Sequence, residues 1–110
     1  MSDLADQKCV PCQGGVPTLS AERVQELLGR LHGWGVEKNH HILRTFTFPD
    51  FKQALDFVNR VGAVAEEEGH HPDIYLSWGM VRIEIWTHKI DGLTESDFVL
   101  AAKIDRLTTA

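Results

Sequence analysis

The feature that most constrains the fold is one long amphipathic helical pattern. It has apolar residues at i, i+3, i+4 and i+7, namely Phe51, Ala54, Leu55, Val58, Val61, Gly62 and Ala65. Asp50 and Gln53 resemble the start of a capping box, and Gly69 suits the left-handed residue that follows a helix. The spacing therefore predicts a helix between residues 50 and 69.

Two pairs of strand-like segments flank this helix. The first pair, 34–37 and 41–48, is rich in aromatic and β-branched residues and is separated by a turn at residues 38–40. The second pair, 73–78 and 80–88, flanks Gly79, which we place at the first central position of a two-residue type II′ turn. Both pairs are therefore predicted to be antiparallel hairpins.

The second hairpin has one apolar face. Apolar Val81, Ile83 and Ile85 alternate with Arg82, Glu84 and Trp86 along the strand. Side chains of a strand alternate between the two faces of a sheet. We therefore expect the first set to face a core and the second set to face away from it.

Two shorter helical patterns complete the chain. Ser20 is a suitable N-cap for Val24, Leu27, Leu28 and Leu31, and Gly33 is expected to end that helix. Thr94 and Asp97 form a capping box for the last helix, with Leu93 and Phe98 as a hydrophobic staple. The order α-β-β-α-β-β-α predicts an α+β domain with a four-stranded antiparallel sheet and its helices packed on one face.

The 110 residues suffice for one domain, which we place at 18–110. Residues 1–17 show no periodicity and are expected to form a flexible arm. This arm carries Cys9 and Cys12 in a CxxC pattern, which is half of a structural zinc site, so two free thiols are the simpler interpretation.

Charge and hydropathy exclude two classes of partner. The net charge of −5 comes without a dense basic cluster, so we expect no nucleic-acid binding. No apolar run approaches the roughly 20 residues that span a bilayer, so no membrane partner is expected. The first residues lack a signal-peptide pattern, so a cytoplasmic location is the default expectation.

Two adjacent histidines are the strongest candidates for chemistry. His70 and His71 follow the end of the long helix and precede Pro72. The helix C-terminus favours a protonated imidazole, and Pro72 holds His71 extended, so the two rings should point in different directions. A second pair, His40 and His41, falls at a turn and a strand start, where solvated surface is expected.

A third histidine is expected to share the cleft of the first two. His88 ends the hairpin that begins beside His70 and His71. Because the two strands of a hairpin are antiparallel, the second strand returns the chain to the edge at which the first strand began. Three such rings suit acid–base catalysis near neutral pH. Metal binding and unrelated surface histidines remain the alternatives at this point.

An ordered set of short motifs runs from Glu66 to Asp105. The set begins with an acidic residue, three spacers and His-His-Pro, and continues with an aromatic-bearing hairpin, Thr-His and Gly-Leu-Thr-x-x-Asp. Its residues are Glu66, His70, His71, Pro72, Thr87, His88, Gly92, Leu93, Thr94 and Asp97. This set, with Trp34 and the helix at 48–66, resembles the pterin-4a-carbinolamine dehydratases over residues 18–107. The cysteine arm resembles an extension of bacterial members.

The resemblance implies a hydro-lyase that converts 4a-hydroxytetrahydropterin to quinonoid dihydropterin and water, without a metal or other cofactor. His70 and His88 would be the proton-transfer groups, while His71 and Pro72 would bind the pterin. The reaction would recycle the pterin of an aromatic amino-acid hydroxylase. A homodimer or dimer of dimers is expected, and a non-enzymatic dimerisation or regulatory protein on the same fold is the alternative.

Three further residues have roles that the sequence leaves open. Glu66 could support His70 from one helical turn away or be a solvated glutamate. Asp97 could orient His88 or only cap its helix. Trp86 shares the strand parity of His88 and could line the cleft or a subunit interface, whereas Trp34 is expected in the core.

Overall fold

The structure is a computed structural model that describes residues 4–7 and 18–108. In chain order the elements are η1 (Leu4–Asp6), α1 (Ala21–Leu28), β1 (Gly35–Glu37), β2 (His41–Thr47), α2 (Phe51–Glu68), β3 (Asp73–Ser77), β4 (Met80–Ile85), η2 (His88–Ile90) and α3 (Glu95–Arg106). The strands form one antiparallel sheet in the order β1-β2-β4-β3. The predicted element order and fold class are confirmed.

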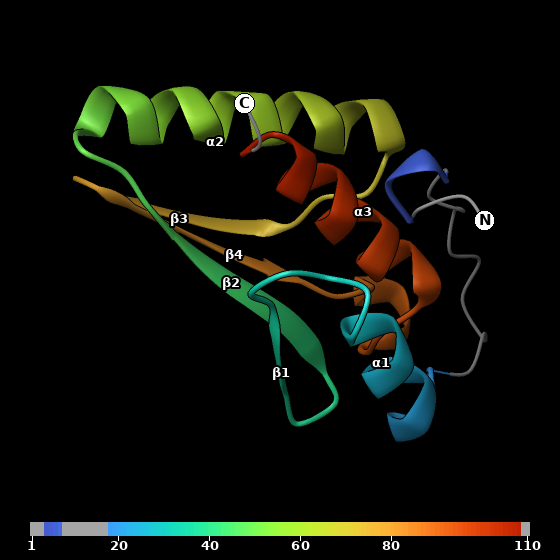
Figure 1. Cartoon of the computed structure of the whole chain (residues 1–110). Coiled ribbons are helices and arrows are strands. Elements are labelled where there is room, and N and C mark those ends of the chain that lie inside the picture. The colour runs from blue at the N-terminus through green and yellow to red at the C-terminus, as the bar shows by residue number, and fades with distance from the viewer. Residues whose placement is uncertain (1–3, 8–17, 109–110) are drawn as a thin grey trace.

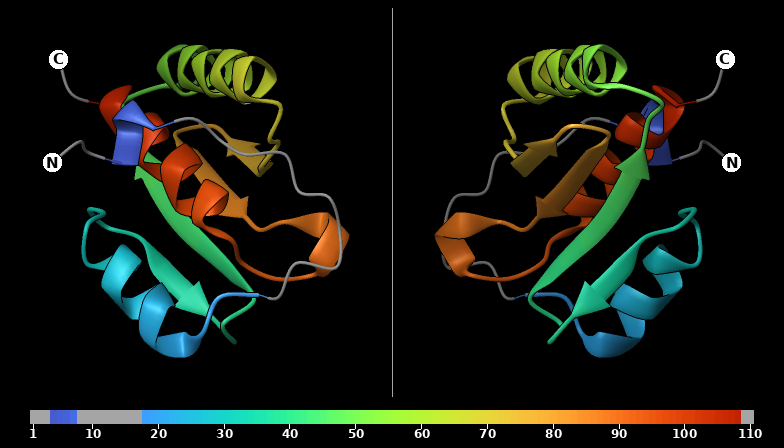
Figure 2. Two further views of the ribbon diagram at one scale, coloured as in Figure 1. Left: turned by 90° about the vertical axis from the view of Figure 1, so that its right-hand side faces the viewer. Right: turned by 90° about the vertical axis from the view of Figure 1, so that its left-hand side faces the viewer.

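The helices cover one face of the sheet. Figure 1 shows α2 and α3 on the same side of the strands, and Figure 2 shows this layering from two further directions. Val81, Ile83 and Ile85 are fully buried in the core beneath these helices, whereas Arg82, Glu84 and Trp86 are only partly exposed on the opposite face. The predicted alternation of β4 is therefore confirmed. Trp34 lies in the core as expected.

Helix α2 begins and ends as predicted, but its buried face is shifted. The Asp50 side chain accepts a hydrogen bond from the Gln53 amide, and Gly69 is left-handed with φ 66°. The buried residues are Ala54, Phe57, Val61 and Ala65. Phe51 and Leu55, which we had placed on the core stripe, are 43% and 38% exposed because they lie on the margin of that face.

Two turns differ from the sequence-based expectation. Helix α1 ends at Leu28 rather than near Gly33, because the chain turns at Gly29 while Leu31 still reaches the core. Gly79 is the second central residue of its hairpin, since Ser77 pairs with Met80, and it does not adopt a positive φ. A Cβ at Gly79 would lie 2.9 Å from the Phe48 carbonyl oxygen, so close backbone approach explains this glycine.

Part of the segment that we expected to be a flexible arm is packed on the domain. Leu4 and Ala5 are buried, and Lys103 Nζ on α3 donates to the Ala5 carbonyl at 2.8 Å. Cys9 and Cys12 lie outside the described residues. None of the helices within the described ranges is long and apolar enough to cross a membrane.

Candidate active site

His70 is held at the end of α2 by the backbone turn at Gly69. The His70 amide donates to the Ala65 carbonyl at 3.2 Å, which closes the helix and directs the next residues toward α3. The His70 Nε2 atom lies 2.5 Å from Asp97 Oδ1 in the first turn of α3. The His70 side chain is 15% exposed, so most of the ring is shielded while one edge still reaches solvent.

Asp97 joins three separate segments of the chain. Its side chain is fully buried, and its second oxygen, Oδ2, accepts from Thr87 Oγ1 at 2.9 Å and from the Thr94 amide at 2.8 Å. An ionised carboxylate only accepts hydrogen bonds, so His70 Nε2 must carry the hydrogen of this contact. The Nδ1 atom of His70 is therefore the ring nitrogen that does not face Asp97.

Asp97 contacts His70 rather than His88. The sequence left open whether Asp97 orients His88 or only caps its helix, and the Asp97 side chain reaches His88 only through Thr87. His88 opens the 3-10 helix η2, and the Thr87 and Gly92 backbones pair across this short loop. This turn leaves His88 exposed while Thr87 is buried. The capping role of Asp97 for α3 is also present.

His71 has a carboxylate partner of its own. Its Nε2 atom contacts Glu66 Oε2 in the last turn of α2, and both side chains are largely exposed. The sequence left open whether Glu66 supports His70 or is solvated, and in the structure its exposed carboxylate contacts His71 and not His70. Neighbouring residues in extended backbone point to opposite sides, so the two rings face different carboxylates. The predicted divergence of His70 and His71 is confirmed.

His88 belongs to a cluster of aromatic rings on the outer face of the sheet. Its ring centroid lies 4.4 Å from that of Trp86 in a T-shaped arrangement. The rings of His40 and His41 lie 5.3 Å and 5.8 Å from Trp86. The tertiary structure therefore joins the second histidine pair to the third histidine.

The solvated-surface interpretation of His40 and His41 is wrong. Their side chains are only 32% and 17% exposed. Ile42 pairs with Ile85 across β2 and β4, so the preceding His41 and the following Trp86 meet on the outer face. The sequence did not predict this neighbourhood, because it depends on the register between β2 and β4.

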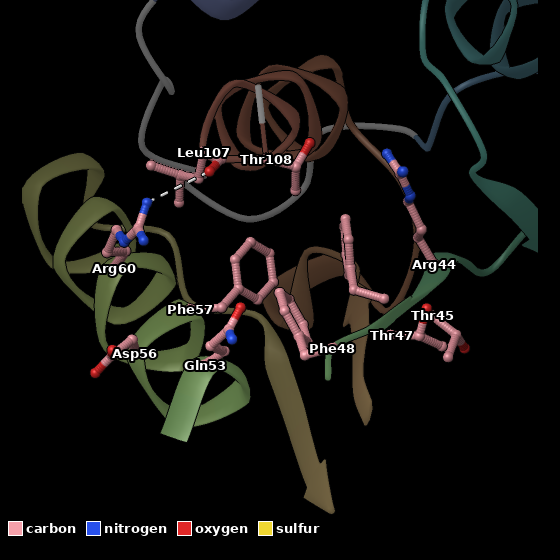
Figure 3. Close-up of a pocket in the computed structure, with 11 residues that line it drawn as sticks. Arg44, Thr45, Thr47, Phe48, Gln53, Asp56, Phe57, Arg60, Leu107 and Thr108 are labelled. Carbon is pink, nitrogen blue, oxygen red and sulfur yellow. Dashed lines mark hydrogen bonds between the residues drawn. The ribbon is translucent and has the colours of Figure 1, made fainter. Parts of the chain in front are cut away.

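A cavity of about 440 Å³ lies elsewhere in the molecule. It opens between β2, the first turns of α2 and the end of α3, and Figure 3 shows the Phe48 and Phe57 rings between Arg44 and Arg60. Its lining contains no histidine, and it lies toward the end of α2 opposite His70. The candidate chemistry therefore lies outside this cavity. Among the described residues, no three His, Cys, Asp or Glu side chains are grouped to hold a metal ion.

Comparisons with known proteins identify the family to which this fold belongs. The family profile of pterin 4 alpha carbinolamine dehydratase matches residues 17–107. A relative from Rubrobacter xylanophilus named for this dehydratase is 60% identical over 97% of this chain and 100% of its own length. One from Rickettsia bellii is 54% identical over 94% of this chain and 93% of its own length.

Solved structures show the same fold. A crystal structure of a transcriptional coactivator/pterin dehydratase from Brucella melitensis has a TM-score of 0.79 and 31% identity, and it covers 84% of this chain and 100% of that chain. A pterin dehydratase-like protein described as a RuBisCO assembly factor in the alpha-carboxysome has a TM-score of 0.62 and 27% identity, over 72% of this chain and 93% of that chain. The fold and the matching relatives define a domain of the hydro-lyase class. The chain belongs to the pterin 4 alpha carbinolamine dehydratase family.

Proposed function

We propose that the protein dehydrates 4a-hydroxytetrahydropterin to quinonoid dihydropterin and water, and so recycles the pterin of an aromatic amino-acid hydroxylase. The observation that carries this proposal is the buried Asp97 carboxylate, which ties His70 to Thr87, the residue before His88. The family match over residues 17–107 supports the substrate class.

The reaction needs proton transfer and no change of oxidation state. The substrate carries a hydroxyl on C4a, next to N5, and hydroxide is a poor leaving group. An acid protonates the hydroxyl as the C4a–O bond breaks, the N5 lone pair forms the new C4a=N5 bond, and the N5 proton passes to a base. One molecule of water leaves, so atoms and charge balance.

His70 and His88 are the proposed acid and base. Asp97 fixes His70 through Nε2 and leaves Nδ1 to exchange the proton, as in other histidines oriented by a carboxylate. His88 is exposed at the start of η2, where it can reach a planar ring from another side. General acid–base catalysis of this kind contributes about 10²–10⁴-fold.

His71 is proposed to bind the pterin rather than to transfer protons. Glu66 contacts the exposed ring of His71, and Pro72 restricts the His71 backbone to an extended conformation. Replacing His71 by alanine should raise KM by about 10-fold and leave kcat within about twofold, because uniform binding is lost. Steady-state kinetics at varied pterin concentration measures both constants. A fall in kcat at unchanged KM would instead assign His71 to the chemistry.

Catalysis is predicted to proceed without a metal. His70 and His71 direct their Nε2 atoms to two different carboxylates, so they do not converge on one ion. Turnover should be unchanged after exhaustive dialysis against a chelator and unchanged again after zinc is restored. Loss of activity on chelation with recovery on zinc would contradict the proposed acid–base mechanism.

The protein is further proposed to assemble as at least a dimer. The sheet face away from the helices carries Trp86 and the half-exposed Tyr75, and Trp78 is exposed at the end of the β3–β4 hairpin. Apolar surface of this kind is commonly covered by another chain. Light scattering at micromolar concentration should give at least twice the 12.4 kDa chain mass. A species of the single-chain mass alone would refute this expectation.

A stopped-flow assay tests the main proposal. The decay of freshly generated 4a-hydroxytetrahydropterin should be faster with the protein than without it, and the rate should scale with protein concentration. A second candidate function, a non-enzymatic regulatory or assembly partner, draws support from the two structural relatives, one described as a transcriptional coactivator and one as a RuBisCO assembly factor. Unchanged decay in the presence of folded protein would favour this second function.

A further inference from the structure

His40 contacts both ends of the loop that carries His88. We propose that His40 is a positioning residue, which fixes the orientation of His88 through Trp86 on one side and Asp91 on the other. This inference rests on the proposed function, because it assigns His88 a role in dehydration. It gives a role to a histidine at the β1–β2 turn, far from the His-His-Pro motif in sequence.

The first contact is with the residue that supports the His88 ring. His88 is exposed, and its ring packs edge to face on Trp86 at 4.4 Å between centroids. The ring of His40 lies 5.3 Å from the same indole. The indole thus lies in contact with both imidazoles, so His40 limits the movement of the support on which His88 rests.

The second contact is with the far end of the loop. Asp91 ends η2 in the left-handed conformation, with φ 52°, and its amide donates to the His88 carbonyl at 3.2 Å. His40 Nε2 lies 2.6 Å from Asp91 Oδ1. His88 therefore lies, along the chain, between two residues that both contact His40.

The hydrogen-bond pattern of His40 fixes its tautomer. A carboxylate only accepts, so the Nε2 atom of His40 donates to Asp91. The His40 and His41 Nδ1 atoms are 3.1 Å apart, and one of them must donate to the other. In a neutral pair, His41 donates and His40 accepts. His40 thus packs against the Trp86 ring and has a contact at each nitrogen, which suits a positioning role better than proton exchange with a substrate.

A double-mutant cycle with the full chain tests this inference. His40→Ala should lower kcat by about 3- to 5-fold with KM within about twofold, a smaller loss than that of His88→Ala, because a misplaced catalytic group loses rate rather than affinity. In a protein that already carries His88→Ala, the same change should have no further effect. His40→Gln retains a donor for Asp91 and should recover part of the loss. His32→Ala, at an exposed histidine between α1 and β1, is the matched control and should leave kcat unchanged.

A nuclear Overhauser measurement supplies a readout that does not need activity. Contacts between the Trp86 indole and the His88 ring should weaken in the His40→Ala protein and persist in the His32→Ala protein. Equal losses from His40→Ala with and without His88 would overturn the inference, as would an unchanged kcat in a His40→Ala protein while His88→Ala lowers it. If the unmodified protein fails to accelerate carbinolamine decay, the proposed function fails, and the Overhauser contacts still decide whether His40 positions His88.

Discussion

Replacing both His70 and His88 by alanine should reduce kcat by about 10³-fold and bring turnover close to the uncatalysed rate. Each single replacement should cost only about 10-fold. In the proposed mechanism the two rings act on the substrate from separate segments, one after α2 and one in η2, so we expect that either can partly supply the acid when the other is missing. The loss from the double replacement corresponds to about 4 kcal/mol of transition-state stabilisation.

Stopped-flow decay of the carbinolamine measures these rates in the unmodified protein, the two single variants and the double variant. His71→Ala removes a histidine from the same motif and should leave kcat nearly unchanged, so it is the matched control. Equal kcat values for the double variant and the unmodified protein would exclude both histidines from the chemistry. A strictly multiplicative loss would mean that each histidine carries a separate proton-transfer step and that neither can replace the other.

Asp97→Ala should be among the most damaging single changes for folding. The substitution removes a fully buried carboxylate that receives hydrogen bonds from His70, Thr87 and the Thr94 amide, and it leaves these donors without their acceptor. Unsatisfied buried donors and a lost helix cap cost about 1–3 kcal/mol and about 1 kcal/mol respectively. We therefore expect the free energy of unfolding to fall by about 3 kcal/mol.

Asp97 should also affect catalysis, and a second variant separates the two effects. Asp97→Asn keeps one acceptor oxygen for Thr87 or Thr94, but its amide nitrogen cannot accept from His70 Nε2. This variant should lose less stability than Asp97→Ala while still showing a clear fall in kcat. Denaturant titration and stopped-flow kinetics measure the two quantities.

Asp105→Ala provides the matched control at the other end of α3. The Asp105 carboxylate also receives two hydrogen bonds, from Trp34 Nε1 at 2.8 Å and from Arg44 at 2.7 Å, but it contacts none of the three candidate histidines. Its loss should lower stability and leave kcat unchanged in the folded protein. A comparable fall in kcat for Asp105→Ala would show that the effect of Asp97 is general destabilisation rather than the orientation of His70.

Local patterns were sufficient to predict most of the elements. The Asp50 cap and the left-handed Gly69 bound α2 because capping depends on groups within a few residues of each other. The alternation along β4 predicted which side chains are buried for the same reason. The exposure of Phe51 and Leu55 at the margin of α2 could not be predicted from local patterns. Both residues are apolar, and only the position of the sheet decides that they remain exposed.

The sequence by itself determined the element order, the three candidate histidines and the divergence of His70 from His71, because each depends on short-range geometry. Only the tertiary structure decided the partners of the carboxylates. Asp97 contacts His70, which is 27 residues away in the sequence, and Glu66 contacts His71 rather than His70. The pairing of β2 with β4 likewise places His40 and His41 beside Trp86. Such contacts depend on strand register and on how α3 packs against the end of α2, and no local spacing encodes either.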